Sequence, residues 1–446
     1  MSRYKAYAEY KDSGVEWLGK VPKHWKVLKI KRLTMVKRGA SPRPIDDPKY
    51  FDDEGKYAWV RIADVTSSDR YLEKTTQRLT ELGQSLSVAL EPDDIFLSIA
   101  GSVGKPIITK IKCCIHDGFV YFPMLKEDRE FLYYIFSSGK PYLGLGKLGT
   151  QLNLNTDTVG DIFIGLPPIA EQRSIARFLD YKTAQIDALI ARKETLLKKL
   201  AEKRTALISQ AVTKGCDRAA PMKDSGIEWL GEIPAHWRIM HLKRALSSSD
   251  YGISDNLSAS GIHPVLRMGN LQNEEITMDD VKYIDKVDPL LILKPNDILF
   301  NRTNSLDLVG KVALFRGSDK FEVTFASYLV RFRTNELADP EYLVFFLGRE
   351  EVQKKASSMA WRAIGQANLN PNRYGYLEIC LPPIKEQREI LSYLKEKLND
   401  LQQPIRKVQI AIAKLKEYRT ALITNAVTGK IDVRDVILEL EPVEAA

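Results

Sequence analysis

The residue types that carry out catalysis occur in this chain, but not at the spacings that known reactions require. Gly101 to Pro106 reads GSVGKP, whereas a phosphate-binding loop has four residues between its glycines and a Ser or Thr after the lysine. Pro92-Asp93 could begin the carboxylate set of a magnesium nuclease, but the next Asp/Glu-x-Lys is Asp180-Tyr181-Lys182, in a predicted helix. The F-x-G-x-G and N-P-P-aromatic motifs of adenine methyltransferases do not occur. These patterns predict a chain that is not itself an enzyme.

Metal-binding and disulfide patterns are also missing from the sequence. The five histidines form no H-x-x-x-H pair, and the four cysteines form no C-x-x-C pair. His24 and His236 lie in a repeated P-x-H-W, which predicts a structural role beside Trp25 and Trp237. No run of about 18 apolar residues is present and no secretory signal is visible at Met1, so we expect a reduced, cytoplasmic protein without a membrane span.

Basic side chains are the remaining candidates for chemistry, and their distribution is uneven. The 446 residues carry a net charge of +8. Residues 166–215 and residues 380–430 each contain ten basic and five acidic side chains, so the excess is concentrated in two short segments. A basic segment can bind nucleic acid or can be the solvated face of a helix, and charge alone leaves both interpretations open.

The elements that must position these side chains are repeated in the sequence. Residues 11–33 and 223–245 are identical at 13 of 23 positions. GLPPIAEQRSIARFL at Gly165–Leu179 recurs as CLPPIKEQREILSYL at Cys380–Leu394, and RTALISQAVT at Arg204–Thr213 recurs as RTALITNAVT at Arg419–Thr428. The chain is therefore a tandem of two units of about 215 residues, the offset between the later pairs.

Each repeat contains a β-rich part and a helical part, which predicts an α+β fold. Short β-rich runs such as 57–62, 94–99 and 119–122 predict mixed α/β domains over residues 1–165 and 216–379, with helices at 128–137 and 340–355. Residues 166–215 and 380–432 show apolar residues at an average spacing of 3.5, typical of a coiled coil. We expect these two helices to be antiparallel, related by a pseudo-two-fold axis, with a kink or a missing hydrogen bond at Pro404. Residues 433–446 form an acidic tail.

Eight basic residues are candidate DNA contacts. Arg61 and Arg267 occupy matching positions near the end of a predicted strand, where each could bind guanine or phosphate, or form a salt bridge that braces the strand. Lys105 and Lys311 each follow a glycine in a predicted loop, which favours a phosphate contact. The other four lie in segments that differ between the repeats and are candidates for base recognition: Lys140, Lys147, Arg302 and Arg362.

The repeated motifs resemble those of a known family. G-x-x-P-x-H-W and L-P-P-I-x-E-Q-R-x-I, followed by R-T-A-L-I and A-V-T, are similar to the motifs of specificity subunits of type I restriction–modification enzymes, over residues 11–432. The resemblance implies two target recognition domains joined by two helical spacers. It also implies a non-catalytic subunit that recognises a bipartite, asymmetric target in double-stranded DNA.

The resemblance further implies partners and cofactors. Two methyltransferase (modification) subunits and two restriction (motor-nuclease) subunits would assemble on the chain. The complex would methylate adenine with S-adenosylmethionine and use ATP and Mg²⁺ for restriction in host defence, with no cofactor bound by this chain. Two alternatives remain open at this point: a stand-alone sequence-specific DNA-binding regulator, and a structural adaptor whose domains bind protein.

Overall fold

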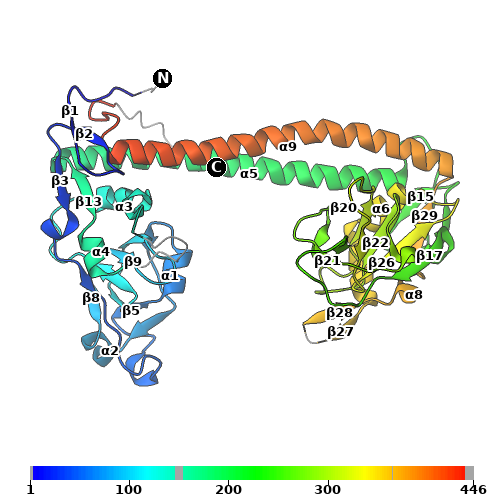
Figure 1. Ribbon diagram of the computed structural model, residues 1–446, viewed down its shortest axis with the longest axis horizontal. Coiled ribbons are helices and arrows are strands. Elements are labelled where there is room, and N and C mark those ends of the chain that lie inside the picture. The colour runs from blue at the N-terminus through cyan, green and yellow to red at the C-terminus, as the bar shows by residue number, and fades with distance from the viewer. Residues whose placement is uncertain (1–3, 146–153, 364, 437–446) are drawn as a thin grey trace. The chain divides into compact units, whose positions relative to one another are not determined.

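The chain forms two compact units that share two long helices. The computed structural model describes residues 4–145, 154–363 and 365–436 (Figure 1). Unit 1 comprises residues 1–194 and 410–446, and unit 2 comprises residues 195–409. Helix α5 (Ile169–Lys214) begins in unit 1 and ends in unit 2, and helix α9 (Ile384–Val427) begins in unit 2 and ends in unit 1. Each unit therefore contains one mixed α/β domain and a segment of both helices.

Two sheets form the domain of unit 1. The first has the strand order β4-β12-β9-β10-β6 and the second β7-β5-β11-β8. Their strands are β4 (Lys37–Arg38), β12 (Phe119–Tyr121), β9 (Ile95–Ser98), β10 (Pro106–Thr109), β6 (Tyr71–Leu72), β7 (Gln77–Leu79), β5 (Tyr57–Val60), β11 (Cys113–Ile115) and β8 (Val88–Leu90). The helices are α1 (Ile62–Ser67), α2 (Glu81–Ser85), α3 (Arg129–Ser137) and α4 (Thr156–Gly160). Strands β5, β9, β10 and β11 are buried along their whole length, so they form the domain's core.

Unit 2 repeats this arrangement and adds a third sheet. Its sheets have the strand orders β17-β26-β22-β24-β20-β19, β21-β18-β25 and β23-β28-β27. The strands are β17 (Leu246–Tyr251), β26 (Leu329–Thr334), β22 (Asp297–Asn301), β24 (Val312–Phe315), β20 (Glu275–Ile276), β19 (Leu271–Gln272), β21 (Lys282–Ile284), β18 (His263–Leu266), β25 (Thr324–Phe325), β23 (Thr303–Asn304), β28 (Gln366–Asn368) and β27 (Trp361–Ala363). The helices are α6 (Pro340–Leu347), α7 (Glu350–Met359) and α8 (Pro371–Tyr374).

Strand pairing aligns the two domains residue by residue. Strand β11 pairs in parallel with β5 (Ile115 opposite Val60), and β25 pairs in parallel with β18 (Phe325 opposite Leu266). Gly39 and Gly252 follow β4 and β17, and a Cβ at either position would lie 2.2 Å from a backbone carbonyl oxygen of the facing turn. Both positions therefore require glycine because two backbone segments approach closely there. The match of Arg61 with Arg267 already aligns β5 with β18 in the sequence, whereas the equivalence of Gly39 and Gly252 comes from the strand pairing.

The repeated motifs form small antiparallel ribbons beside the long helices. In unit 1, β1 (Tyr10–Asp12) pairs with β2 (Lys20–Pro22), and β3 (Lys26–Lys29) pairs with β13 (Phe163–Leu166). In unit 2, β14 (Met222–Asp224) pairs with β15 (Glu232–Pro234), and β16 (Arg238–His241) pairs with β29 (Glu378–Leu381). Strands β13 and β29 lead directly into α5 and α9, so these ribbons connect each domain to its helix.

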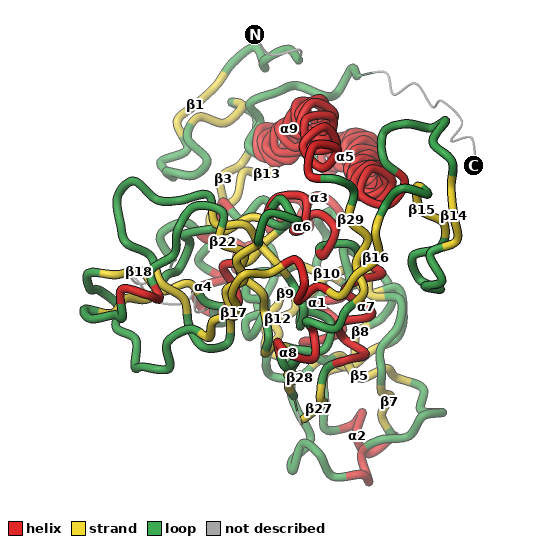
Figure 2. The backbone as a smooth tube through the Cα atoms, turned by 90° about the vertical axis from the view of Figure 1, so that its right-hand side faces the viewer, coloured by secondary structure: helices red, strands yellow, loops and turns green. Residues whose placement is uncertain are grey.

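Within each unit the segments of α5 and α9 lie side by side and antiparallel (Figures 1 and 2). In unit 1, Arg419 pairs with Asp187 at 2.8 Å and Lys416 pairs with Glu194 at 3.6 Å. Residue numbers therefore increase along one helix in the direction in which they decrease along the other. The predicted antiparallel pairing is confirmed. Helix α9 continues through Pro404, so this residue removes one backbone hydrogen bond without ending the helix.

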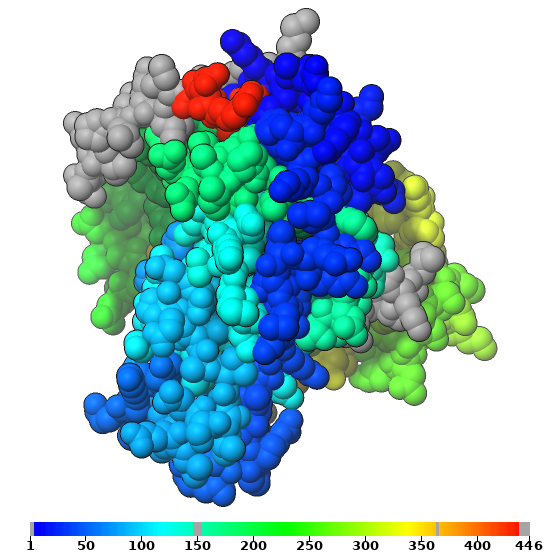
Figure 3. All heavy atoms as spheres, turned by 90° about the vertical axis from the view of Figure 1, so that its left-hand side faces the viewer, coloured from blue at the N-terminus to red at the C-terminus, as the bar shows by residue number. Residues whose placement is uncertain are grey.

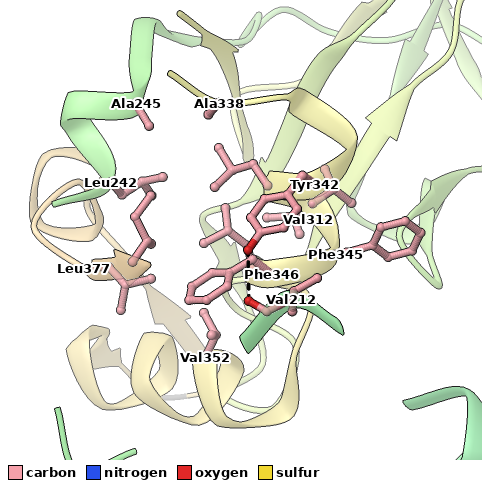
Figure 4. Close-up of a cluster of buried hydrophobic side chains, with 14 of the residues drawn as sticks. Val212, Leu242, Ala245, Val312, Ala338, Tyr342, Phe345, Phe346, Val352 and Leu377 are labelled. Atoms are coloured by element: carbon pink, nitrogen blue, oxygen red, sulfur yellow. Dashed lines mark hydrogen bonds between the residues drawn. The ribbon is translucent and has the colours of Figure 1, made fainter. Parts of the chain in front are cut away.

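The core of unit 2 includes α5 directly. Tyr342 of α6 is fully buried, and its hydroxyl donates a 3.0 Å hydrogen bond to the carbonyl oxygen of Val212 near the end of α5 (Figure 4). Burial raises the pKa of Tyr342 well above its ordinary value, which keeps the hydroxyl a donor. In unit 1, the chain after α9 lies against the N-terminal residues (Figure 3), where Asp432 N–H donates to the carbonyl oxygen of Lys5 at 2.8 Å.

One predicted helix was right and one was wrong. The helix expected at 128–137 is α3, whose N-cap is Asp128. The single helix expected at 340–355 is instead two helices, α6 and α7, separated at Gly348 and Arg349. Arg349 has an extended backbone and a buried side chain that donates to Ser209 Oγ of α5 at 3.1 Å. Because that contact needs the chain to turn toward α5, the helix is interrupted there.

Candidate nucleic-acid interface

The two repeated motifs meet in space and attach each domain to a helix end. In unit 1, Trp25 Nε1 donates to Glu171 Oε1 at 2.9 Å, and His24 Nε2 lies 2.8 Å from Glu171 Oε2. Glu171 lies in the first turn of α5, where the helix dipole favours a carboxylate. The structural role predicted for His24 beside Trp25 is thus confirmed.

Unit 2 repeats the same contacts at the start of α9. Trp237 Nε1 donates to Glu386 Oε1 at 3.0 Å, and His236 Nε2 lies 2.7 Å from Glu386 Oε2. The glutamine that follows each glutamate is also shared. Gln172 accepts from Asp128 N–H at 2.9 Å, and Gln387 accepts from Asp339 N–H at 2.8 Å, so each glutamine holds the N-cap of a domain helix. The E-Q pair of the motif is therefore structural in both units.

The two units carry different side chains at equivalent positions where several strands end. In unit 1, the C-terminal ends of β4, β5 and β9 and the turn from β11 to β12 carry a set that we call rim 1: Arg38, Arg61, Ile99, His116 and Asp117. The strand registers place their equivalents in unit 2, which we call rim 2: Tyr251, Arg267, Arg302, Ala326 and Ser327. Only the arginine that directly follows β5 or β18 is shared.

Rim 1 contains two exposed arginines, Arg38 and Arg61. Arg38 Nε donates to the carbonyl oxygen of Asp117, whose carboxylate accepts from Arg43 at 3.1 Å and from Ser41 at 2.9 Å. Burial lowers the pKa of His116, and the nearby charges of Arg61 and Arg38 act in the same direction, while Asp117 opposes them. His116 Nδ1 accepts from Gly118 N–H at 2.8 Å. A neutral imidazole thus lies among exposed guanidinium groups, which can donate to guanine or to phosphate.

In rim 2, the equivalent turn is bound by an arginine that follows a different strand. Arg302 follows β22 and donates to the carbonyl oxygen of Ser327 at 3.4 Å and to Asn368 Oδ1 at 3.1 Å. Its guanidinium carbon lies 5.0 Å from the ring centre of Tyr251, the equivalent of Arg38. An arginine therefore binds the carbonyl oxygen of the equivalent turn residue in both units, but it comes from different strands.

The other sequence candidates fall into different environments. Arg61 is exposed, whereas Arg267 forms an ion pair with Asp280 at 3.0 Å, the bracing alternative considered for both. Lys105 Nζ donates to the carbonyl oxygens of Thr66 and Ser68 at 3.2 and 2.5 Å, so it holds the C-terminal end of α1. Lys311 occupies the equivalent position and makes no side-chain hydrogen bond or ion pair among the described residues.

Three candidates lie away from the rim residues in sequence. Lys140 is partly exposed and begins a short 3-10 helix, and Arg362 is exposed on β27. Lys147 lies outside the described residues. No structural feature here tests which candidates contact DNA, and the assignment remains a prediction. Sequence reasoning missed Arg38, His116 and Tyr251, because only strand pairing reveals that they lie beside Arg61 and Arg302.

The described residues offer little alternative chemistry. Residues 4–145, 154–363 and 365–436 contain no group of three His, Cys, Asp or Glu side chains that could hold a metal ion. Burial raises the pKa of the Cys113 and Cys380 thiols to about 12, so they are poor nucleophiles. Across the same described ranges, no helix is long and apolar enough to cross a membrane.

Comparison with known proteins agrees with this arrangement. The family model for the type I restriction modification DNA specificity domain matches residues 22–199 and 244–410. The EcoKI specificity subunit of Escherichia coli (strain K12) is 23% identical over 434 residues, covering 93% of this chain and 90% of its own. The MjaVIII specificity subunit of Methanocaldococcus jannaschii is 23% identical over 435 residues, covering 94% and 95%.

A solved structure shows the same fold. It is described as the structural basis underlying complex assembly and conformational transition of the type I R-M system, and its matching chain is 17% identical with a TM-score of 0.65. The match covers 92% of this chain and 99% of the other. The two family-model matches cover both repeats and most of the sequence. This chain therefore belongs to the family of type I restriction–modification DNA specificity subunits.

Proposed function

We propose that the chain is the non-catalytic subunit that selects the DNA target of a type I restriction–modification complex. Unit 1 recognises one half of a bipartite, asymmetric site in double-stranded DNA and unit 2 recognises the other. One observation carries the proposal: the two units share their fold and anchoring contacts but differ at four of the five equivalent rim positions. A common frame with different side chains at one edge is what two different half-sites require.

The chain also serves as the assembly platform in this proposal. Two methyltransferase subunits, and two restriction subunits where the host encodes them, bind the repeated elements. The internal repeat supports this, because two identical partners need two equivalent surfaces. The ribbons and helix ends that contain the repeated motifs are the candidates. S-adenosylmethionine, ATP and Mg²⁺ are assigned to those partners.

A selection experiment tests the proposal. The chain is purified with the methyltransferase subunit encoded nearby, mixed with randomised duplexes, and the bound DNA is sequenced. We expect two short specific sequences separated by a fixed gap. The chain alone is tested in parallel, because equally tight and selective binding without the methyltransferase would favour a stand-alone regulator. Stable assembly without any enrichment would contradict DNA recognition and leave a protein adaptor.

A further inference from the structure

Trp361 differs from every other tryptophan of the chain in its exposure. Trp25, Trp59 and Trp237 are buried with at most 1% of their surface exposed, and Trp17 and Trp229 are half-buried. Trp361 exposes 73% of its surface. An indole is the largest apolar side chain, so leaving it in water forgoes a substantial burial energy. The position therefore indicates a partner rather than a contribution to folding.

The exposed indole belongs to a strand that is paired within a three-stranded sheet. Strands β27 and β28 form a hairpin, and β28 pairs in turn with β23. Ala367 in β28 and Leu369 directly after it are buried, and Leu369 N–H donates to the carbonyl oxygen of Arg302 at 2.8 Å. Figures 1 and 2 place the hairpin at the end of unit 2 away from α5 and α9. Trp361 is thus presented to solvent by a supported sheet.

The hairpin joins Trp361 to rim 2. Asn368 lies directly opposite Trp361 on one side and Thr303 on the other, so the three side chains project from one face of the sheet. Asn368 Oδ1 accepts from Arg302, which lies over the ring of Tyr251. Tyr251 and Tyr328 are about half exposed, at 46% and 47%. Strand pairing and a hydrogen bond therefore connect Trp361, through Asn368, to Arg302 and the ring of Tyr251.

Unit 1 has no matching aromatic residue in its sequence. The 215-residue offset between the repeats aligns Gln366 with Gln151 and Asn368 with Asn153. The same offset places Gly146 at the position of Trp361 and Lys147 at the position of Arg362. A basic residue is common to both, whereas the indole belongs to unit 2 alone. A side chain that is present in only one unit can contact only the half-site that this unit recognises.

We propose that Trp361 is a specificity-determining residue of unit 2, whose indole inserts against a base step of the half-site recognised by that unit. The proposal rests on the proposed function. Apolar side chains that insert at a base step unstack it partly, and the cost depends on the step, so the contact selects flexible steps without base-edge hydrogen bonds. Sequence alone makes Arg362, the next residue, a candidate for base recognition. In this proposal it contacts phosphate without sequence preference, because unit 1 has a basic residue, Lys147, at the equivalent position.

The test uses the full chain with its methyltransferase partner, in three variants. Trp361→Ala removes the ring, Trp361→Phe keeps an aromatic face, and Phe321→Ala removes another exposed aromatic side chain from unit 2. Phe321 is 49% exposed and precedes β25 at the end opposite rim 2, so it serves as the matched control. Bound duplexes are selected from a random pool, and affinity is measured on the selected wild-type sequence.

We expect Trp361→Ala to weaken binding about 5- to 150-fold, the range for loss of one base–aromatic stack. Selectivity should fall at one or two adjacent positions of one half only, with Trp361→Phe intermediate and Phe321→Ala unchanged. In duplexes that carry 2-aminopurine at successive steps, the fluorescence should increase at that position when the wild-type complex binds. It should not increase with Trp361→Ala. Arg362→Ala should weaken all sequences about equally.

Two results would overturn the inference. Trp361→Ala could bind with the same affinity and motif as Phe321→Ala, which excludes a DNA contact. Alternatively, Trp361→Ala could lose the methyltransferase on gel filtration while Phe321→Ala retains it, which assigns the indole to a protein partner. If the wild-type complex itself selects no split motif, the proposed function fails, and that outcome is separable because it does not depend on the variants.

Discussion

Trp25 and Glu171 lie 146 residues apart in sequence, yet the indole Nε1 donates a 2.9 Å hydrogen bond to the carboxylate of Glu171. Trp237 and Glu386 repeat the bond at 3.0 Å. The P-x-H-W and L-P-P-I-x-E-Q-R motifs are thus two halves of one joint between a recognition domain and a helix. In unit 1 a third donor is present: Tyr7 donates to Glu171 at 2.7 Å, and the 212-residue offset places Ala219 at its counterpart.

The extra donor predicts unequal effects of one substitution at the two joints. Glu171 is 6% exposed, and Glu171→Gln turns an amide toward donors that then lack an acceptor, at about 1–3 kcal/mol each. We expect a loss of about 2–4 kcal/mol for Glu171→Gln and about 1–2 kcal/mol for Glu386→Gln. Urea unfolding measures the total loss of stability. Hydrogen exchange, compared between residues 4–33 and residues 222–245, assigns each loss to its unit. Equal losses would show that the Tyr7 contact contributes nothing.

The joint also shows what the sequence could and could not predict. The repeated motifs share identical residues, so the sequence predicts the tandem α+β organisation and the antiparallel helices. The bond between Trp25 and Glu171 did not, because both motifs are local and nothing in either specifies its partner. Rim 1 draws Arg38, Arg61 and His116 from separate strands, and only their pairing brings them together. The break at Arg349 was hidden because the helical pattern continues through it and only the contact with Ser209 explains it.

His116 predicts a pH dependence confined to unit 1. Its pKa lies below the ordinary 6.5, first because of burial and then because of Arg61 and Arg38. The folded state therefore binds fewer protons than the unfolded state, and stability should fall as the pH decreases from about 6.5. His116→Asn keeps an acceptor for Gly118 N–H and should remove this slope. The measurement is the free energy of unfolding between pH 5 and 8, and an unchanged slope in the variant would contradict the assignment.

Lys105 and Lys311 occupy equivalent positions but should have different roles. Lys105 should be structural and Lys311 should bind DNA. Lys105 holds the carbonyl oxygens of Thr66 and Ser68, so Lys105→Ala should cost about 0.5–1.5 kcal/mol of stability. Lys311→Ala should leave stability unchanged and reduce the slope of log affinity against log salt by about 1. Binding isotherms at four salt concentrations provide the comparison. A reduced salt slope for Lys105→Ala alone would reverse the two roles.

Arg38 and Arg302 should each control one half of the target. Both bind the carbonyl oxygen of the turn residue at equivalent positions, and both can present remaining donors to a base. Arg38→Ala should relax one position in the half-site of unit 1, and Arg302→Ala one position in the other half, each by about 1–3 kcal/mol. Competition binding with single-base variants of the selected duplex measures this. Relaxation spread over both halves by either variant would indicate a general loss of folding or affinity.

The central claim is that the two units recognise two different half-sites, and adenine methylation in cells tests it most directly. The chain is co-expressed with its methyltransferase subunit, and methylated adenines are mapped across the genome with and without it. The account predicts one split motif with a fixed gap, of which only one half changes when residues 41–150 are exchanged for those of a relative. A stable complex that adds no sequence-specific methylation, or an exchange that alters both halves, would contradict it.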